Sequence, residues 1–361
     1  EAITHVVDSG RFLHGPDVTG LEEEIAQLCQ VPAAIGCASG SDALLLALMA
    51  WEIGPGDEVI VPSFTFFATA SCVARVGARI VFADIDPATY QISPDSVAEL
   101  IGPDTRAVIP VHLFGAPAPL DALSDIIGDR PIHIIEDAAQ AIGAISRGRP
   151  VGSIGDVGCF SFYPTKNLGG LGDGGMLTTR DTALADRLRL YAAHGMRPRY
   201  YHSVIGINSR LDSIQAAALR VKLRQLPRWN AARAERAKRY GHCLAQAGLE
   251  EHLALPQVAP EDTSVWNQYT VRVRSGRRDA LRAHLRDQGI ATEIYYPVPL
   301  HQQECFRGGQ VRWRDLSATE EAAREVLSLP VHPGLTEAQQ DRVVDAIATF
   351  FAQATRRRAS A

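Results

Sequence analysis

Lysine is scarce in this chain of 361 residues. Only three of its 36 basic residues are lysine (Lys166, Lys222 and Lys238), and all the others are arginine. Arginine supplies a positive charge as well as lysine does, but its guanidinium stays protonated and does not act as a nucleophile. A lysine kept at a special place is therefore expected to be needed for its amine.

Long apolar runs are also missing, and none approaches the roughly 20 residues of a membrane-spanning helix. The first residues are not a charged region followed by an apolar one, so we expect no signal peptide. The chain begins with Glu1 rather than Met, and we expect further N-terminal sequence before it. The six cysteines are scattered and form no C-x-x-C pair, which indicates a reduced, cytoplasmic protein with buried thiols and no metal site.

An excess of positive charge is absent as well. The net charge is -5, and no long basic run precedes the arginines at 356–358. Nucleic-acid-binding proteins usually carry a basic stripe, so we expect neither nucleic acid nor a membrane as a partner. The composition, 46% hydrophobic and 21% charged, is that of a folded globular protein and excludes a disordered chain, a coiled coil and a collagen-like fibre.

What the chain has is an alternation of short β-branched runs with helical patterns. This alternation predicts an α/β fold with a mostly parallel sheet flanked by helices. Strands are predicted at 33–37, 58–62, 79–84, 107–111, 133–136, 158–162 and 176–179. Helices are predicted at 42–51, 67–76, 94–100, 120–127 and 182–193.

A long helical pattern from 211 to about 247, interrupted by Pro227, reads as a connector to a second unit. We therefore expect a large domain at 1–240 and a smaller C-terminal α/β domain at 241–361. In the second domain, strands are predicted at 268–273 and 292–294, a helix at 278–288, and further helices from Ala318 and Thr336.

The segment 161–175, SFYPTKNLGGLGDGG, carries the most chemical information. A predicted strand ends and Lys166 follows in a glycine-rich loop, where the backbone turns tightly and approaches a ligand closely. A lysine there can form a Schiff base with a carbonyl cofactor when its amine is neutral. The plain alternative is a surface lysine in a flexible loop.

Four more segments carry candidate groups. In 133–140, HIIEDAAQ, an Asp at the end of a strand can hold a pyridinium nitrogen protonated, and Gln140 can donate to a ring oxygen; a helix-capping Asp is the alternative. In 37–44, CASGSDAL, a small-residue turn opens a helix whose N–H groups can bind phosphate. Aromatic residues in the segment 62–67 can stack on a ring or belong to the core. The segment 205–212 has polar residues directly before the long helical pattern.

Together these segments supply the groups of one kind of cofactor site: a phosphate cradle, a ring-stacking aromatic, an Asp below a ring nitrogen and a Schiff-base lysine. The combination of 136–140, 161–175 and 208–212 resembles the DegT/DnrJ/EryC1/StrS family of sugar aminotransferases. The resemblance extends from the SGRFLHGP segment at 9–16 to LSLPVHP at 327–333. It implies the type I, aspartate-aminotransferase-like fold of enzymes that depend on pyridoxal 5'-phosphate (PLP), with pyridoxamine 5'-phosphate (PMP) as an intermediate form.

The resemblance implies roles for individual residues. Lys166 would bind the cofactor covalently and move the proton. The remaining cofactor contacts would come from Gly40, Ser41, Phe66, Asp137, Gln140, Ser161 and, from a neighbouring subunit, Asn208. Arg210 and Tyr296 would meet the sugar nucleotide from that same neighbour, which implies a homodimer with shared active sites.

The implied reaction moves an amino group from L-glutamate to a keto group of a UDP- or dTDP-linked sugar, for amino-sugar or glycosylated natural-product biosynthesis. The alternatives are an aminohydroxybenzoate-type synthase and a DegT-like transcriptional regulator. Lys166 argues against the dehydratase branch of the family, which has histidine there. Relatives that handle 3-keto sugars often read His-Tyr-Pro where this chain has Tyr295, Tyr296 and Pro297, a departure that concerns the identity of the sugar.

Overall fold

The computed structural model describes the backbone of residues 1–359 and the side chains up to 353, so the side chains of the arginines at 356–358 lie outside it. The helices are α1 (Ala2–Ser9), α2 (Pro16–Leu28), α3 (Gly40–Ala50), α4 (Ala68–Val76), α5 (Pro94–Leu100), α6 (Leu120–Ile127), α7 (Thr182–Ala192), α8 (Ser213–Leu223), α9 (Leu226–Gln246), α10 (Arg278–Asp287), α11 (Ser317–Glu325) and α12 (Glu337–Ala359). Short 3-10 turns span Leu113–Gly115, Leu300–Gln302 and Glu304–Phe306.

The strands form one large sheet and two small ones in the described part of the chain. The large sheet contains β1 (Ala33–Cys37), β2 (Glu58–Pro62), β3 (Arg79–Ala83), β4 (Thr105–Val108), β5 (His133–Asp137), β8 (Val157–Ser161), β9 (Gly175–Thr179) and β13 (Val311–Trp313). The small sheets contain β10 (Leu253–Ala254), β12 (Tyr269–Val273) and β14 (Val326–Leu329), and β6 (Ile145–Ser146), β7 (Arg149–Pro150) and β11 (Asp262–Thr263).

The large sheet has the order β1-β9-β8-β5-β4-β2-β3-β13 and is mostly parallel. Only β9 runs against its neighbours, β1 and β8. Because β1 and β8 both oppose β9, their carboxyl ends lie at the same edge as those of β2 and β5. That edge is where open α/β sheets bind ligands.

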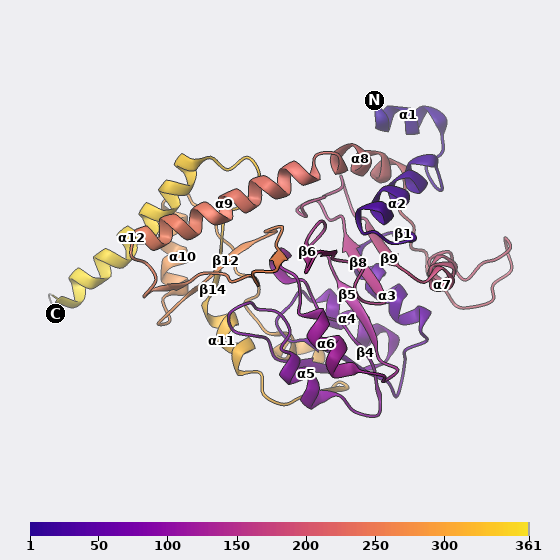
Figure 1. The fold of residues 1–361 in the computed structure, drawn as a ribbon, viewed down its shortest axis with the longest axis horizontal. Coiled ribbons are helices and arrows are strands. Elements are labelled where there is room, and N and C mark those ends of the chain that lie inside the picture. Colours follow the sequence, from indigo (N-terminus) through magenta and orange to yellow (C-terminus); the bar gives the residue numbers. More distant parts are fainter. Residues whose placement is uncertain (360–361) are drawn as a thin grey trace.

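Both faces of this sheet are covered by helices, as the apolar strands predict. In β2, Val59 and Val61 belong to the core beneath α3, α4 and α7, whereas Ile60 belongs to the core beneath α5 and α6. Successive side chains of a strand point to opposite faces, so a run in which each of these residues is buried requires two covering layers. Figure 1 shows the sheet between these helix layers.

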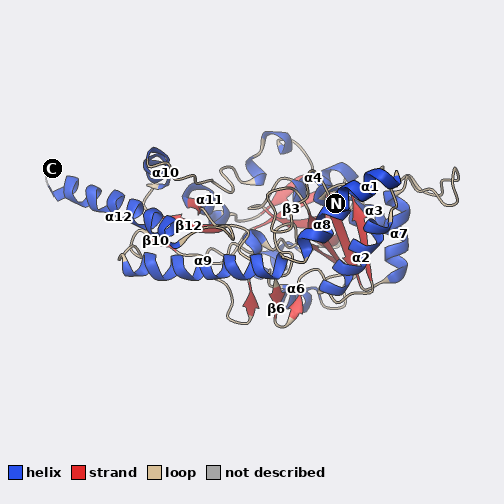
Figure 2. Ribbon diagram, turned by 90° about the horizontal axis from the view of Figure 1, so that it is seen from above, coloured by secondary structure: helices blue, strands red, loops and turns tan. Residues whose placement is uncertain are grey.

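The helix α9 connects this sheet to the C-terminal elements, as Figures 1 and 2 show. Pro227, expected to interrupt one long helix, instead stands in the first turn of α9. Proline is favoured there because the first N–H groups of a helix have no intrahelical partner. The long helical pattern is therefore two helices, α8 and α9.

One sequence expectation for the C-terminal part is wrong. The predicted strand at 292–294 is only an isolated bridge between Glu293 and Ser328, and β12 pairs with β10 and β14. The pattern also missed β13, which pairs in parallel with β3 in the large sheet. Within residues 1–359, none of the helices combines the length and apolar character needed to cross a membrane.

The six cysteines are free thiols, and four of them, Cys29, Cys37, Cys72 and Cys159, are buried as expected. Cys243 is only partly buried and Cys305 is exposed, so the expectation of buried thiols is wrong for these two.

Candidate active site

A cavity of about 570 Å³ lies at the carboxyl edge of the large sheet. Segments that follow β1, β2, β5 and β8 supply most of its wall, as the parallel topology predicts. Eight residues selected from the sequence line it: Gly40, Ser41, Phe66, Asp137, Gln140, Ser161, Lys166 and Tyr296. Asn208 and Arg210 are not among its lining residues; they lie together, with the Arg210 guanidinium donating to the side-chain oxygen of Asn208.

Lys166 sits in a loop that folds back tightly on itself after β8. A Cβ on Gly169 would lie 2.3 Å from the carbonyl oxygen of Pro164, so only glycine permits this approach. Burial lowers the pKa of Lys166, while the nearby Asp137 charge acts in the opposite direction. A lowered pKa leaves more of the amine neutral and nucleophilic.

The next residue fixes this loop to the rest of the protein. The Asn167 side chain donates to the Asn230 side chain and to the Val265 carbonyl, each at 2.8 Å. Its side-chain oxygen accepts from the Asn267 amide, also at 2.8 Å. Asn167 and Asn267 are buried. No local sequence pattern indicates this cluster, because its members are far apart in the chain and only Asn167 stands beside a residue selected from the sequence.

Asp137 is the last residue of β5 and is 4% exposed. Its Oδ2 accepts from the Thr69 hydroxyl at 2.8 Å, and its Oδ1 accepts from the Ala139 N–H at 3.2 Å. Burial raises the pKa of Asp137, and these two donors oppose that rise. A buried carboxylate of this kind is stabilised by a cation placed beside it. Thr69, on α4, was not selected from the sequence.

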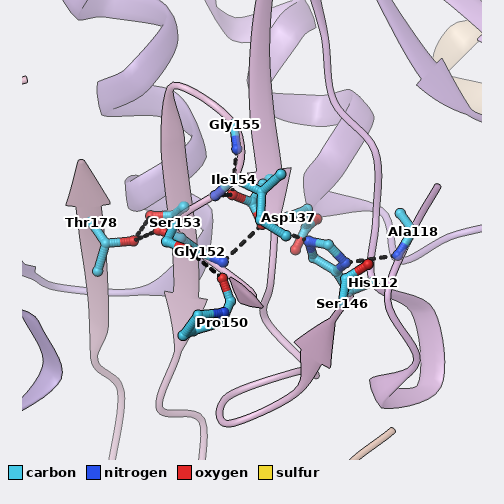
Figure 3. Close-up of polar contacts among 12 residues, drawn as sticks. His112, Ala118, Asp137, Ser146, Pro150, Gly152, Ser153, Ile154, Gly155 and Thr178 are labelled. Atoms are coloured by element: carbon cyan, nitrogen blue, oxygen red, sulfur yellow. Dashed lines mark hydrogen bonds and ion pairs between the residues drawn. The ribbon is translucent and has the colours of Figure 1, made fainter. Parts of the chain in front are cut away.

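Glu136 points away from Asp137, as expected for neighbours in a strand. Its carboxylate accepts from the N–H groups of Gly152, Ile154 and Gly155 and from His112 Nε2, at 2.7 to 3.0 Å. Figure 3 shows these donors converging. Burial opposes charge on Glu136, but together these donors outweigh it and hold its pKa below the ordinary value.

His112 is a neutral ring in this arrangement. Its Nδ1 accepts from the Ala118 N–H at 2.9 Å, which leaves Nε2 to carry the proton donated to Glu136 (Figure 3). The pair thereby fixes the 112–118 turn to β5. Glu136 and Asp137 are adjacent in the sequence at the end of β5, but only Asp137 lines the cavity, whereas Glu136 lies in the protein interior.

Gln140 has its amide orientation fixed. Its Oε1 accepts from the Phe114 N–H at 2.6 Å, so its Nε2 is left as the donor on the cavity side. That Nε2 donates to the Tyr296 hydroxyl at 3.4 Å. Tyr296, expected to reach the sugar nucleotide from a neighbouring subunit, thus lines the cavity of its own chain.

The start of α3 forms a small cradle. The Ser39 side chain and carbonyl accept from Asp42 and Ala43, while the N–H groups of Gly40 and Ser41 have no partner among the described residues. A Cβ on Gly40 would lie 2.7 Å from the Cβ of Ser161, so the glycine lets the two loops meet. Free N–H groups at a helix start, with a serine hydroxyl beside them, suit a phosphate.

The donor set therefore fits PLP. The cradle suits its phosphate, the buried Asp137 suits a protonated ring nitrogen, and the Gln140 amide suits its phenolic oxygen. The Phe66 ring, 57% exposed at the cavity, offers a stacking surface, and Lys166 offers an amine. The fold and this site define a PLP-dependent transferase of the type I class.

A family model identifies the group within that class. The model of the DegT/DnrJ/EryC1/StrS aminotransferase family matches residues 1–348, and the chain belongs to this family. Its fold and its PLP chemistry are therefore those inferred from the sequence, and the protein is a PLP-dependent aminotransferase.

Characterised relatives carry differing names. The chain is 46% identical to the "Pleiotropic regulatory protein" of Geobacillus stearothermophilus, over 97% of this chain and 93% of the relative. It is also 46% identical to a dTDP-3-amino-3,4,6-trideoxy-alpha-D-glucose transaminase of Streptomyces venezuelae, over 96% and 90%. A UDP-N-acetyl-3-dehydro-alpha-D-glucosamine 3-aminotransferase of Acidithiobacillus ferrooxidans is 44% identical over 96% and 91%.

Solved structures agree with the fold and the cofactor. S. venezuelae DesV, in complex with a ketimine intermediate, has a TM-score of 0.92 at 46% identity and covers 97% of this chain and 93% of its own. NtdA from Bacillus subtilis, with bound cofactor PMP, has a TM-score of 0.90 at 31% identity and covers 97% and 80%.

Proposed function

We propose that this protein transfers an amino group from L-glutamate to a keto group of a UDP- or dTDP-linked sugar. The observation that carries the proposal is the pairing, in one cavity, of a lysine whose pKa is lowered by burial with a buried, hydrogen-bonded Asp. The sugar-nucleotide substrate rests on the transaminase names of relatives that match over nearly the whole chain.

PLP, when bound, draws into its ring the electrons left on a carbon that loses a proton. The protein's own residues prepare that chemistry. Lys166 Nζ would hold the cofactor and, when free, would move the proton at the reacting carbon. Asp137, held by Thr69, would keep the ring nitrogen protonated. Gln140 would donate to the phenolic oxygen, and Phe66 would cover one face of the ring.

We also propose a homodimer with shared sites. Asn208 is exposed and lies outside the cavity of its own chain, so in the dimer it would reach the phosphate in the partner's cavity, and Arg210 would meet the sugar nucleotide there. The segment between α7 and α8 supports this arrangement, because it projects beyond the body of the protein in Figures 1 and 2 and carries Tyr200, Tyr201 and Ile205 exposed by 71% or more.

The test begins with the visible absorption spectrum of the PLP-loaded protein, recorded before and after L-glutamate is added. We expect a yellow band that fades with glutamate and returns with a keto-sugar nucleotide. Borohydride should fix the cofactor to a single peptide, the one with Lys166, and Lys222 and Lys238 serve as internal controls. A Lys166→Ala variant that keeps turning over would contradict the proposal.

A further inference from the structure

Ser63, His301 and Glu320 form a hydrogen-bonded cluster near the carboxyl edge of the large sheet. The Ser63 hydroxyl lies 2.8 Å from Nδ1 of His301, and Nε2 of His301 donates to the Glu320 carboxylate at 3.3 Å. The N–H groups of Leu300 and His301 also donate to the carbonyl and the hydroxyl of Ser63, at 2.9 and 3.3 Å. Serine, histidine and a carboxylate in this order also occur in hydrolases. Ser63 is fully buried and does not line the cavity, so this cluster holds segments together rather than attacking a substrate.

The His301 ring is fixed on all sides. Its side chain is only 6% exposed. The ring packs against those of Trp313 and Phe82, with ring centroids 5.4 and 6.5 Å apart. A buried imidazole nitrogen needs a hydrogen-bond partner, and Ser63 supplies one for Nδ1 while Glu320 supplies one for Nε2. The two partners therefore determine how the ring is oriented.

Both partners of His301 are attached to the carboxyl edge of the large sheet. Ser63 directly follows β2. Glu320 lies in α11, and the carboxylate of Asp84 accepts from two N–H groups in the first turn of this helix, at 3.0 and 2.8 Å. Asp84 directly follows β3, the neighbour of β2 in the sheet. His301 therefore joins the segment before it to the edge that forms the cavity.

The segment joined in this way carries Tyr296, which lines the cavity. The four residues between Tyr296 and His301, PVPL, include two prolines, whose rings fix φ and stiffen the segment. The Tyr296 ring contacts that of Phe66, with centroids 6.2 Å apart, and Phe66 stands only three residues after Ser63. The contact between Ser63 and His301 therefore fixes the Tyr296 side of the cavity relative to Phe66.

We propose that His301 is a positioning residue for transamination. Its bond to Ser63 holds the Tyr296 ring against Phe66, and Phe66 in turn orients the cofactor ring. The inference rests on the proposed function, which places that ring beside Phe66. The orientation matters because a displacement of about 1 Å from the productive geometry can lower a rate about a hundredfold. His301 lies outside the cavity and acts only through the residues that line it.

His301→Asn and His301→Gln form a matched pair of variants, because both replace the aromatic ring with an amide. The Asn amide lies near the place of Nδ1 and keeps the contact with Ser63, while Glu320 retains the side-chain amide of Gln302 as a donor at 3.0 Å. The Gln amide reaches the place of Nε2 and keeps the contact with Glu320, so the Ser63 hydroxyl loses its partner. Ser63→Ala removes the same contact from the other side.

Two readouts follow the PLP-loaded protein: the visible circular dichroism per mole of bound cofactor, and the rate at which the yellow band fades with L-glutamate. We expect His301→Gln and Ser63→Ala to weaken the circular dichroism and to slow the fading by about tenfold to a hundredfold. His301→Asn should stay close to wild type in both. The double variant of His301→Gln and Ser63→Ala should lose little more than either alone. Urea unfolding checks that each variant folds.

Equal effects of His301→Asn and His301→Gln would overturn the inference, and so would wild-type readouts in His301→Gln. A lower free energy of unfolding with both readouts unchanged overturns it as well, because the contact is then only structural. If Phe66→Ala leaves the circular dichroism unchanged, the proposed place of the cofactor ring is wrong, and this inference fails with it. A wild-type protein whose yellow band does not fade with glutamate contradicts the proposed donor, and the circular dichroism alone then decides the inference.

Discussion

The Thr69 hydroxyl donates to Asp137 Oδ2 at 2.8 Å, and both groups are buried. The contact joins the first turns of α4 to the end of β5 across 68 residues of sequence. It favours the charged form of a carboxylate whose pKa burial raises. Thr69 thereby helps to orient Asp137 and opposes the effect of its burial.

Removing this donor should weaken cofactor binding most at acidic pH. Thr69→Val raises the pKa of Asp137 further, so the carboxylate becomes protonated at a higher pH and loses its attraction for a ring cation. We expect the Kd for PLP, titrated by absorbance at several pH values, to rise by about tenfold at the acidic end. Thr69→Ser keeps the hydroxyl and serves as the control. An unchanged pH profile in Thr69→Val would show that the hydroxyl does not tune Asp137.

Lys166 should react with small aldehydes at a lower pH than an ordinary lysine does. Only the neutral amine attacks, and burial lowers the pKa of Lys166, so its neutral fraction rises at lower pH. Reductive methylation of the cofactor-free protein, followed by peptide mass spectrometry, gives the rate at each pH. A midpoint at or above that of Nα-acetyl-lysine in the same tube would contradict the shift.

Glu136→Gln should destabilise the protein by about 3 kcal/mol, because an amide cannot accept from all four donors and places its own NH2 against two of them. Urea unfolding measures the loss. Glu52→Gln is the control: its carboxylate pairs with Arg187 on the surface, and its loss should cost less than about 1 kcal/mol.

The carboxylate of Glu136 should also make the free energy of unfolding depend on pH in the acidic range. The pKa of Glu136 is lower in the folded protein than in the unfolded chain, so its contribution is present above the unfolded value, about 4.3 for a free Glu side chain. The contribution is lost as pH falls through the folded value. Glu136→Gln should therefore have a flatter dependence of unfolding free energy on pH below about 4.3. If the unfolding free energies of Glu136→Gln and wild type change in parallel over this acidic pH range, the prediction is wrong.

Shared active sites predict complementation between two inactive variants. Lys166→Ala and Asn208→Ala should each abolish or strongly reduce turnover alone. In a mixed dimer both defects fall in one site and the other site is intact, so an equal mixture that exchanges subunits should recover about a quarter of wild-type activity. Sites built from a single chain would recover none. Gel filtration of each variant confirms that dimers form.

Most of the large sheet was predictable because its strands are apolar runs bounded by glycine, proline and polar turns. The bounds of β1, β2, α5 and α6 match the prediction. The site residues in the cavity were predictable for a related reason: they stand within a few residues of strand ends, and parallel topology gathers those ends at one edge.

What could not be predicted depends on contacts between distant segments. No local pattern in the sequence marks Thr69 as the partner of Asp137, or Asn267 as the partner of Asn167. The strand expected at 292–294 failed because a β-branched run resembles a strand even where no neighbour is available to extend the pairing. The sequence also does not indicate that Tyr296 lines the cavity of its own chain, because that position depends on contacts such as the one between Tyr296 and Gln140.

The strand β13 has a consequence for biosynthesis. Residues 311–313 pair with β3, and the Arg312 side chain donates to Glu58 at the start of β2. The edge strand of the large sheet is therefore translated long after the strand that it covers. A nascent polypeptide therefore carries β3 as a bare edge until those residues leave the ribosome. An unpaired edge of this kind is a template for aggregation, and it is the surface that chaperones would have to shield during synthesis.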